Sequence, residues 1–479
     1  MAQDTSNPTL IQGEKIVGEK IVELPVPGRK AEICVVPKLF DGASYSTRDT
    51  KVMEQLCAID VRKNAAVCPK LNSTNPGLDI FSIPDGTTAQ KFEDTHCTSP
   101  KGEKIAKYKL STSCSYTPSL LGYYHVSRIL GNVANVPPSV LRPYDLADHI
   151  ALGRKALAQA PASSLIHATW ASLMAQFTAR ANASRRALLL TDDFSQSYGA
   201  LVDNPSHEEF YKEFFNGGAN NVARAQNFRD RNPTMAMLAR SADVSTMVGR
   251  GFTADNVQKM VQLKDASELI VLDTLLNQQD RFGNIHEVPV YYYLDAQDGK
   301  VKTEQKLAAD EVTQRKAVKI KQMMLKDSDC GVAKTNIAQS AGLADRIAHM
   351  DPETYYRLLS FDQMTGRPEL EAFFRHETLF TAADFASLRA NLKQLASQLH
   401  QRCTTGRLKL DLDLGAHFSD KPLPSRSCER SGQTFQKFHF RNSISAIPFQ
   451  GFLKDSLKQC RPSHRSEWLA ESPRQNPGE

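Results

Sequence analysis

The sequence lacks most of the signatures that name an enzyme class directly. It has no GxSxG nucleophile elbow, HExxH zinc motif, GxxxxGK phosphate loop or Rossmann glycine fingerprint, so nothing supports those classes. No stretch approaches the roughly 20 apolar residues of a membrane-spanning helix. The first residues also lack the basic-then-apolar pattern of a signal peptide, although a mature or trimmed chain would begin in the same way.

The bulk composition is that of an ordered protein with a sizeable core. The chain has 479 residues, enough for two or three domains of roughly 150 residues, and 41% of them are hydrophobic. Its formal net charge of +6 is mild for this length. We therefore expect no nucleic-acid partner, although an acidic ligand such as a nucleotide fits the charge.

Cysteine is almost missing from the middle of the chain. Five cysteines occur near the front (Cys34, Cys57, Cys68, Cys97 and Cys114) and three near the back (Cys403, Cys428 and Cys460). Only Cys330 lies between these groups. The clustering predicts disulfides and an oxidising compartment, meaning a secreted, periplasmic or secretory-pathway protein. The alternative is a cytoplasmic protein with buried thiols. Paired CxxC motifs are absent, which argues against structural zinc.

Strand-like segments fill the front of the chain. Residues 1–27 are polar and predict a tail or an edge strand. Apolar and β-branched residues then predict strands within 31–40, 78–88 and 103–111. Next, the pattern predicts a helix over 117–131, an extended segment over 136–143, two helices within 149–182 and two strands about a turn within 185–203.

Helical patterns dominate the back. We expect helices within 207–215, 233–242, 253–263, 265–279 and 352–401. The helix over 265–279 has the strongest pattern, with Asp265 and Glu268 as a capping-box-like pair at its start. Strands are expected over 288–295 and 317–325, with a charged insertion over 296–317 and an irregular segment over 402–479.

Two acidic motifs carry the most specific chemistry in the chain. Asp280 and Asn284 lie four residues apart in DRFGN, after an apolar helical run. Asp327 and Asp329 follow an apolar strand in KDSDCG. In phosphoryl transfer an aspartate orients the accepting hydroxyl, while an asparagine and a further carboxylate hold Mg²⁺ against nucleotide phosphates. The alternative is that both motifs are ordinary surface turns.

The wider context of these motifs resembles an atypical kinase. LDTLLNQQDRFGN resembles the catalytic loop of secretory-pathway (Golgi casein kinase-like) kinases, HipA-type toxin kinases and phosphatidylinositol 4-kinases. HVSRILGNVANVPPSVLR resembles the helix-then-extended segment of the secretory group. Residues 100–335 share the resemblance, which implies an α+β, two-lobed protein-kinase-like fold. Its parts would be a tail (1–27), a strand-rich N-lobe (28–205), a mainly helical C-lobe (206–400) and a cysteine-bearing extension (401–479).

The resemblance implies roles for individual residues. Asp280 would be the catalytic aspartate and Asn284 a ligand of Mg²⁺ or Mn²⁺. Asp327 matches the metal-binding aspartate best, Asp329 is the alternative, and both would suit a cation that prefers oxygen ligands. ATP would be the phosphoryl donor, and the acceptor would be a hydroxyl on a protein or another molecule.

The phosphate-binding lysine has two candidates. Lys107 and Lys109 point to the same side of a strand, so alternation cannot separate them. The Tyr108-Lys109 pair fits the secretory pattern better. The resemblance also implies a helix glutamate that pairs with this lysine, but the matching position falls near Leu120, and no acidic residue occurs between Glu103 and Asp145.

Three functions follow from these observations. The first is an active, metal-dependent kinase. The second is a pseudokinase that binds nucleotide without catalysis, which the missing glutamate favours. The third is a secreted, disulfide-stapled binding protein, which the cysteine distribution favours. We also expect His125 to be a packing histidine, His286 a loop histidine, and Arg281 an anchor for the DRFGN loop.

Overall fold

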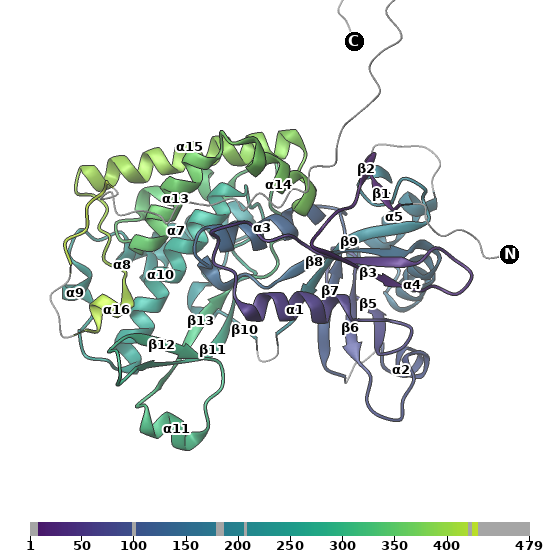
Figure 1. Ribbon diagram of the computed structural model, residues 1–479, viewed down its shortest axis with the longest axis horizontal. Helices are drawn as coiled ribbons and strands as arrows, with labels where there is room; N and C mark the ends of the chain where they lie inside the picture. The colour runs from purple at the N-terminus through teal and green to yellow at the C-terminus, as the bar shows by residue number, and fades with distance from the viewer. Residues whose placement is uncertain (1–7, 98–101, 179–185, 206–207, 420–423, 430–479) are drawn as a thin grey trace, which may run out of the picture. The chain divides into compact units, whose positions relative to one another are not determined.

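The computed structural model describes residues 8–97, 102–178, 186–205, 208–419 and 424–429. Strands dominate its first part and helices its second, so the predicted α+β class is confirmed (Figure 1). Cys460 and most of the predicted irregular segment after residue 429 lie outside the described residues.

An antiparallel sheet of seven strands forms the frame of the described N-terminal part. Its order is β3-β4-β8-β9-β7-β6-β5. The strands are β3 (Lys20–Leu24), β4 (Glu32–Val36), β5 (Ala65–Pro69), β6 (Gly77–Ser82), β7 (Lys104–Lys109), β8 (Ser139–Asp145) and β9 (Gln196–Asp203). The strands predicted within 31–40, 78–88 and 103–111 are thus present, and β3 is an edge strand. Before it, β1 (Leu10–Ile11) and β2 (Glu14–Lys15) form a two-stranded ribbon.

Five helices accompany this sheet in the described residues. They are α1 (Thr47–Cys57), α2 (Ala89–His96), α3 (Thr117–Ile129), α4 (Leu146–Gln159) and α5 (Leu165–Thr178). The predicted helix at 117–131 and the pair within 149–182 are confirmed. All of α3 is buried, because Leu120 and Leu121 pack with Leu141, Tyr198 and Ala200 in one apolar cluster against the sheet.

The two strands predicted within 185–203 are not both present. The second is β9, but the first is reduced to a single bridge between Leu190 and Ser197. Asp193 explains the difference, because its carboxylate accepts hydrogen bonds from Thr191 and from the backbone and side chain of Ser195. These local bonds close a turn where a longer ladder would otherwise extend.

A single long helix, α10 (Ala254–Leu275), replaces the two helices predicted within 253–279. Thr253 caps it, so the expected capping box at Asp265 and Glu268 is wrong. Both acids lie buried in the middle of α10 and accept backbone N–H groups from other segments. Asp265 accepts from Met323 at 2.9 Å, and Glu268 accepts from Ala134 at 2.6 Å. Hydrogen bonds to distant parts of the chain, and not a helix start, thus explain why these two acids occur here.

Three of the four strands of a smaller sheet follow α10 in the chain, and the fourth precedes it. The sheet contains β10 (Glu209–Phe210), β11 (His286–Leu294), β12 (Val301–Glu304) and β13 (Val318–Met324), with α11 (Ala309–Gln314) between the last two strands. The helix predicted within 207–215 is wrong. Glu209 and Phe210 pair with β11 instead, Tyr211 donates its N–H to Ile285 at 2.9 Å, and helical structure is limited to one 3-10 turn, Lys212–Phe214.

The remaining described helices complete the second part. They are α7 (Asn221–Arg231), α8 (Pro233–Leu238), α9 (Val244–Met247), α12 (Ile337–Ser340), α13 (Pro352–Met364), α14 (Pro368–Thr378), α15 (Ala382–Thr404) and α16 (Leu414–His417). The helices α13 and α14 fall within the predicted helical region 352–401, and α15 begins in it and ends three residues beyond it. No helix among the described residues has the length and apolar content needed to cross a bilayer.

Four disulfides join the described cysteines, as the clustering predicts. Three close short loops: Cys34–Cys57, Cys68–Cys97 and Cys403–Cys428. The fourth, Cys114–Cys330, spans 216 residues. It joins the connection between β7 and α3 to the KDSDCG segment. The sequence alone had left the pairing of the cysteines open.

Candidate functional site

Lys109 ends β7 with its ammonium group inside the protein. Its Nζ atom lies 2.7 Å from Asp327 Oδ1 and 3.0 Å from Asp329 Oδ1. The small residues Gly77 and Ala200 are its neighbours on the flanking strands. Burial by itself lowers the pKa of Lys109, but the charges of Asp327 and Asp329 raise it above its ordinary value. Lys109 is thus a fixed cation that joins the sheet to the KDSDCG segment.

Lys107 lies on the same side of β7 and contacts a different acid. Its Nζ lies 3.7 Å from Glu208 Oε1, and Glu208 also forms an ion pair with Lys326. Of the two lysines that the sequence left open, Lys109 is the one that contacts Asp327 and Asp329.

Asp327 combines a charged state with an unusual backbone. Burial opposes its ionisation, but Lys109, Lys107 and Lys70 hold the pKa of Asp327 well below its ordinary value. Its φ of 56° is in the left-handed region, which non-glycine residues seldom adopt and which occurs often at functional sites. The result is an ionised carboxylate aimed by a constrained backbone, as a ligand of a hard cation requires.

Arg281 fixes the DRFGN loop to the KDSDCG segment. Its guanidinium is 1% exposed and lies 3.0 Å from Asp273 Oδ2 in α10. It also donates to the Lys326 carbonyl at 2.8 Å and to Ser328 Oγ at 3.0 Å. Tyr123 completes the network by donating its hydroxyl to Asp273 at 2.9 Å. The expected anchoring role of Arg281 is therefore confirmed.

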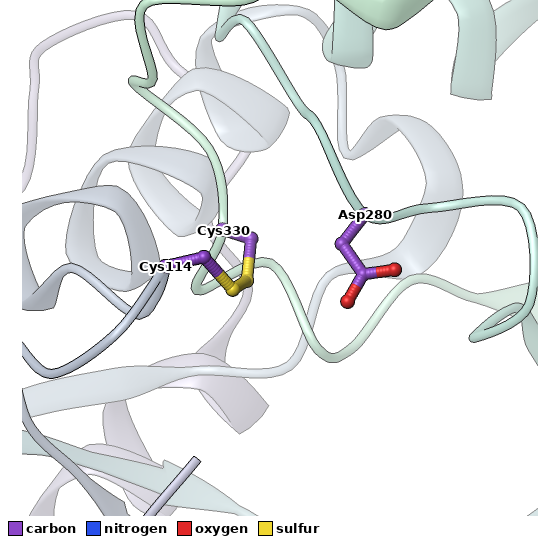
Figure 2. A group of neighbouring side chains, drawn as sticks. All are labelled: Cys114, Asp280 and Cys330. Atoms are coloured by element: carbon purple, nitrogen blue, oxygen red, sulfur yellow. A yellow bond between two sulfur atoms is a disulfide. The ribbon is translucent and has the colours of Figure 1, made fainter. Parts of the chain in front are cut away.

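Asp280 lies next to this anchor and beside the Cys114–Cys330 disulfide (Figure 2). One carboxylate oxygen and the two sulfur atoms are all within 4.8 Å of one another. Burial and the charge of Asp329 raise the pKa of Asp280, and a hydrogen bond with Asn221 opposes them. The two sulfurs are bonded to each other, so they are not metal ligands in this state.

Asn284 is half-buried at the end of the DRFGN loop. Its backbone N–H donates to the Arg281 carbonyl at 2.9 Å. Within the described part of the chain, no hydrogen bond joins its side chain to Asp327 or Asp329. The structure therefore brings together Lys109, Asp327 and Asp329 and places Asp280 beside the Cys330 side chain, while the side chain of Asn284 is not bonded to either aspartate in the described residues.

Helix α3 contacts the site through hydroxyl groups, since it has no carboxylate. Ser119 Oγ donates to the Ser328 carbonyl at 2.6 Å. The position expected for a glutamate, Leu120, packs in the core instead. Gly331 lies so close to α3 that a Cβ atom there would be 2.5 Å from Ser119 Oγ and 2.6 Å from the Tyr123 ring. Lys109 thus pairs with Asp327 and Asp329 and not with a glutamate of α3.

Further lysines near Asp327 were missed in the sequence. Lys70 follows β5, and burial together with the charge of Lys109 lowers its pKa to about 8. Burial and Lys107 lower the pKa of Lys326 to about 6. A lysine pKa falls in this way where cations crowd in a poorly hydrated space. Sequence reasoning had no signal for Lys70, because β5 itself was not predicted.

The two histidines singled out in the sequence differ in their surroundings. His125 is fully buried in α3, where its Nδ1 lies 2.7 Å from the Tyr45 hydroxyl and burial lowers its pKa to about 3. It is a packing residue, as expected. His286 is half-buried and begins β11, so it belongs to a strand rather than to a loop. Burial lowers the pKa of His286, and the charge of Asp327 opposes that effect.

Comparisons with known proteins complete the description. No protein-family model and no curated protein matches the sequence. A solved structure of the Golgi casein kinase is similar at 12% identity and a TM-score of 0.41, covering 74% of this chain and 76% of that one. Its form with Mn/ADP bound has 11% identity, a TM-score of 0.39 and the same coverage. The hydra Fam20 structure with sugar has 11% identity and a TM-score of 0.39, covering 77% and 95%. At this level of similarity, the geometry of the site has to carry the functional assignment.

Proposed function

We propose that this protein is an atypical kinase that transfers the γ-phosphoryl group of ATP to a hydroxyl of a protein or another acceptor. The observation that carries the proposal is the meeting of Lys109 with Asp327 and Asp329, with Asp280 beside the side chain of Cys330, the residue that follows Asp329. Phosphoryl transfer needs such a set: a lysine for the phosphates, carboxylates for the metal and an aspartate for the acceptor.

The carboxylates suit a hard divalent cation. Lys109, Lys107 and Lys70 keep Asp327 ionised, and oxygen ligands are those that Mg²⁺ and Mn²⁺ prefer. Asp327 and Asp329 would hold the ion, with Asn284 as a further candidate ligand. When bound, the cation supplies positive charge that offsets the charge developing on the phosphoryl oxygens.

The residues of the chain have separable tasks in this reaction. Lys109 binds a phosphate oxygen, and the further cations Lys70 and Lys107 add to the positive potential that attracts the nucleotide. Asp280 accepts a hydrogen bond from the acceptor hydroxyl, orients it and takes up its proton. Arg281 holds Asp280 in place relative to Asp327 through its bonds to Asp273 and the Lys326 carbonyl.

The experiment is a Mg²⁺- or Mn²⁺-dependent ATP-consumption assay on the wild type and Asp280→Ala. We expect turnover in the wild type and a loss of about 10²–10⁴-fold in the variant, the usual contribution of general acid–base catalysis. Asp85→Ala, on an exposed turn after β6, is the matched control and should keep full turnover. Equal turnover in wild type and Asp280→Ala would contradict the assignment of Asp280.

A pseudokinase is the second candidate, because α3 offers no carboxylate to Lys109. In that case the wild type would bind Mn–ADP, with binding weakened in Lys109→Met, but would not consume ATP.

The four disulfides support a location in an oxidising compartment, such as the secretory lumen, the periplasm or the extracellular space.

A further inference from the structure

The Cys114–Cys330 disulfide lies inside the candidate site. Cys330 directly follows Asp329, and Cys114 lies in the connection that leads from Lys109 to α3. The carboxylate of Asp280 is within 4.8 Å of both sulfurs (Figure 2). A staple that only stabilised the fold would have no need to be placed against the reacting groups.

Three further segments contact the two linked cysteines or the residues next to them. Asn75 Nδ2, in the turn between β5 and β6, lies 3.5 Å from Cys114 Sγ and 3.8 Å from Cys330 Sγ. The N–H of Gln279, which precedes Asp280, donates to the Cys330 carbonyl at 3.2 Å. The Tyr116 N–H, at the start of α3, donates to the Asp329 carbonyl at 2.8 Å. The β5–β6 turn, the start of α3 and the loop that carries Asp280 therefore meet around the disulfide.

We propose that Cys114 and Cys330 are positioning residues for phosphoryl transfer, and that their disulfide holds Asp280 in the orientation that the acceptor hydroxyl requires. The inference rests on the proposed kinase function. It also predicts a division of labour in the site. Lys109 pairs with Asp327 and Asp329 through side-chain atoms that are not part of the disulfide, so we expect the residues that bind the nucleotide to keep their arrangement without it. Without the disulfide, Cys330 is no longer held beside Gln279 and Asp280. We therefore expect Asp280 to lose the orientation that the acceptor hydroxyl requires.

The disulfide thereby makes activity sensitive to a dithiol reductant. A thiolate of the reductant attacks one sulfur, and a mixed disulfide forms and then resolves. Overall, the S–S bond between Cys114 and Cys330 breaks, two S–H bonds form, and the dithiol becomes a disulfide. Two electrons and two protons pass to the protein in the exchange.

The test compares two double variants of the full chain. Cys114→Ser/Cys330→Ser removes the disulfide at the site, and Cys403→Ser/Cys428→Ser removes one that closes a loop after α15. We expect the first variant to lose about 10- to 100-fold in kcat, the usual effect of a misplaced catalytic group. Its Kd for Mn–ADP should stay within about twofold of the wild-type value, because Lys109 keeps its partners. The control variant should keep both values.

The outcomes separate the inference from the proposed function. An inactive wild type overturns the kinase function and the positioning role with it. An active wild type with unchanged kcat in Cys114→Ser/Cys330→Ser overturns the positioning role alone. A parallel loss of kcat and Mn–ADP affinity indicates a general structural role and also overturns it.

A reduction experiment covers the case in which the double variant does not fold. The wild type is treated with dithiothreitol, the free thiols are alkylated in samples taken over time, and mass spectrometry identifies which disulfide has opened. We expect kcat to fall in step with the opening of Cys114–Cys330 and to return on reoxidation. A loss of kcat that coincides with the opening of a different disulfide contradicts the proposal.

Discussion

Lys109 and Asp327 are 218 positions apart in the chain, yet Lys109 Nζ lies 2.7 Å from Asp327 Oδ1. The lysine belongs to the sheet and the aspartate follows β13, so this contact closes the candidate site.

Replacing Lys109 should lower the stability of the protein and make it depend on a metal ion at Asp327 and Asp329. Lys109→Met leaves the carboxylates of Asp327 and Asp329 without their cation, and we expect the free energy of unfolding to fall by about 3–5 kcal/mol. Mn²⁺ should recover part of this loss, because it takes over the neutralising charge. Urea denaturation with and without Mn²⁺ measures both effects. Lys107→Met is the matched control, and its loss should be smaller because Lys107 lies 3.7 Å from Glu208. A Lys109→Met variant that Mn²⁺ does not stabilise would argue against a metal at these carboxylates.

The buried pair of Arg281 and Asp273 should be essential to the stability of the fold. Arg281→Ala leaves the carboxylate of Asp273 buried without its cation, which costs about 3–5 kcal/mol. Arg281→Lys keeps the charge but not the planar fork, so it should recover only part of the loss. Thermal unfolding compares the two variants with Arg229→Ala, which removes a partly exposed ion pair with Asp230 and a hydrogen bond to the Ala341 carbonyl and should cost far less. Equal melting temperatures for all three would show that the network around Arg281 is dispensable.

Close packing at Gly331 should tolerate no side chain. In Gly331→Ala the new Cβ would meet Ser119 Oγ and Tyr123, and overpacking of this kind costs about 1–3 kcal/mol. It should also move Asp329 away from Lys109 and lower ATP turnover. Gly366→Ala is the control, because its Cβ would meet open space. Full turnover in Gly331→Ala would show that the contact between α3 and the KDSDCG segment can shift without consequence.

Acid should destabilise the protein through two buried histidines. Burial lowers the pKa of His125 and of His149 to about 3 from an ordinary value of 6.5. The unfolded chain therefore binds protons at these sites below about pH 6.5, while the folded chain does not until about pH 3. Because the unfolded state binds more protons, the free energy of unfolding falls as the pH falls through this window.

The expected loss between pH 7 and pH 5 is about 1–2 kcal/mol for each of these histidines. Denaturant titrations of the wild type and His149→Gln at both pH values measure it. The variant should lose less stability on acidification than the wild type does. His376→Gln, at an exposed position, should follow the wild type. An identical pH dependence in all three proteins would show that His149 is protonated equally in both states.

Local patterns predicted the elements better than the contacts between them. The strand with Lys107 and Lys109, helix α3 and the helix before Asp280 all follow from their local apolar patterns and from the residues that bound them. The pattern of Asp265 and Glu268 is that of a helix start, although both are buried in mid-helix. Their partners, the N–H groups of Met323 and Ala134, come from segments far away in the sequence.

Partners that lie far apart in the sequence could not be predicted. The isolation of Cys330 was visible, but its pairing with Cys114 depends on how β7, α3 and the KDSDCG segment pack together. The missing helix glutamate was also visible. That Lys109 takes both of its partners from the KDSDCG segment follows only from the tertiary structure.

The 216 residues between Cys114 and Cys330 also set an order of events during synthesis. At the usual speed of translation, Cys114 waits roughly ten to forty seconds before its partner emerges. Throughout this interval the thiol of Cys114 is close in sequence to four earlier cysteines, which can complete their native pairs, Cys34–Cys57 and Cys68–Cys97, without it. Oxidative maturation therefore has to leave one thiol free until the nascent chain has passed the candidate site, and a cell that oxidises thiols too early would trap the protein in a mispaired form.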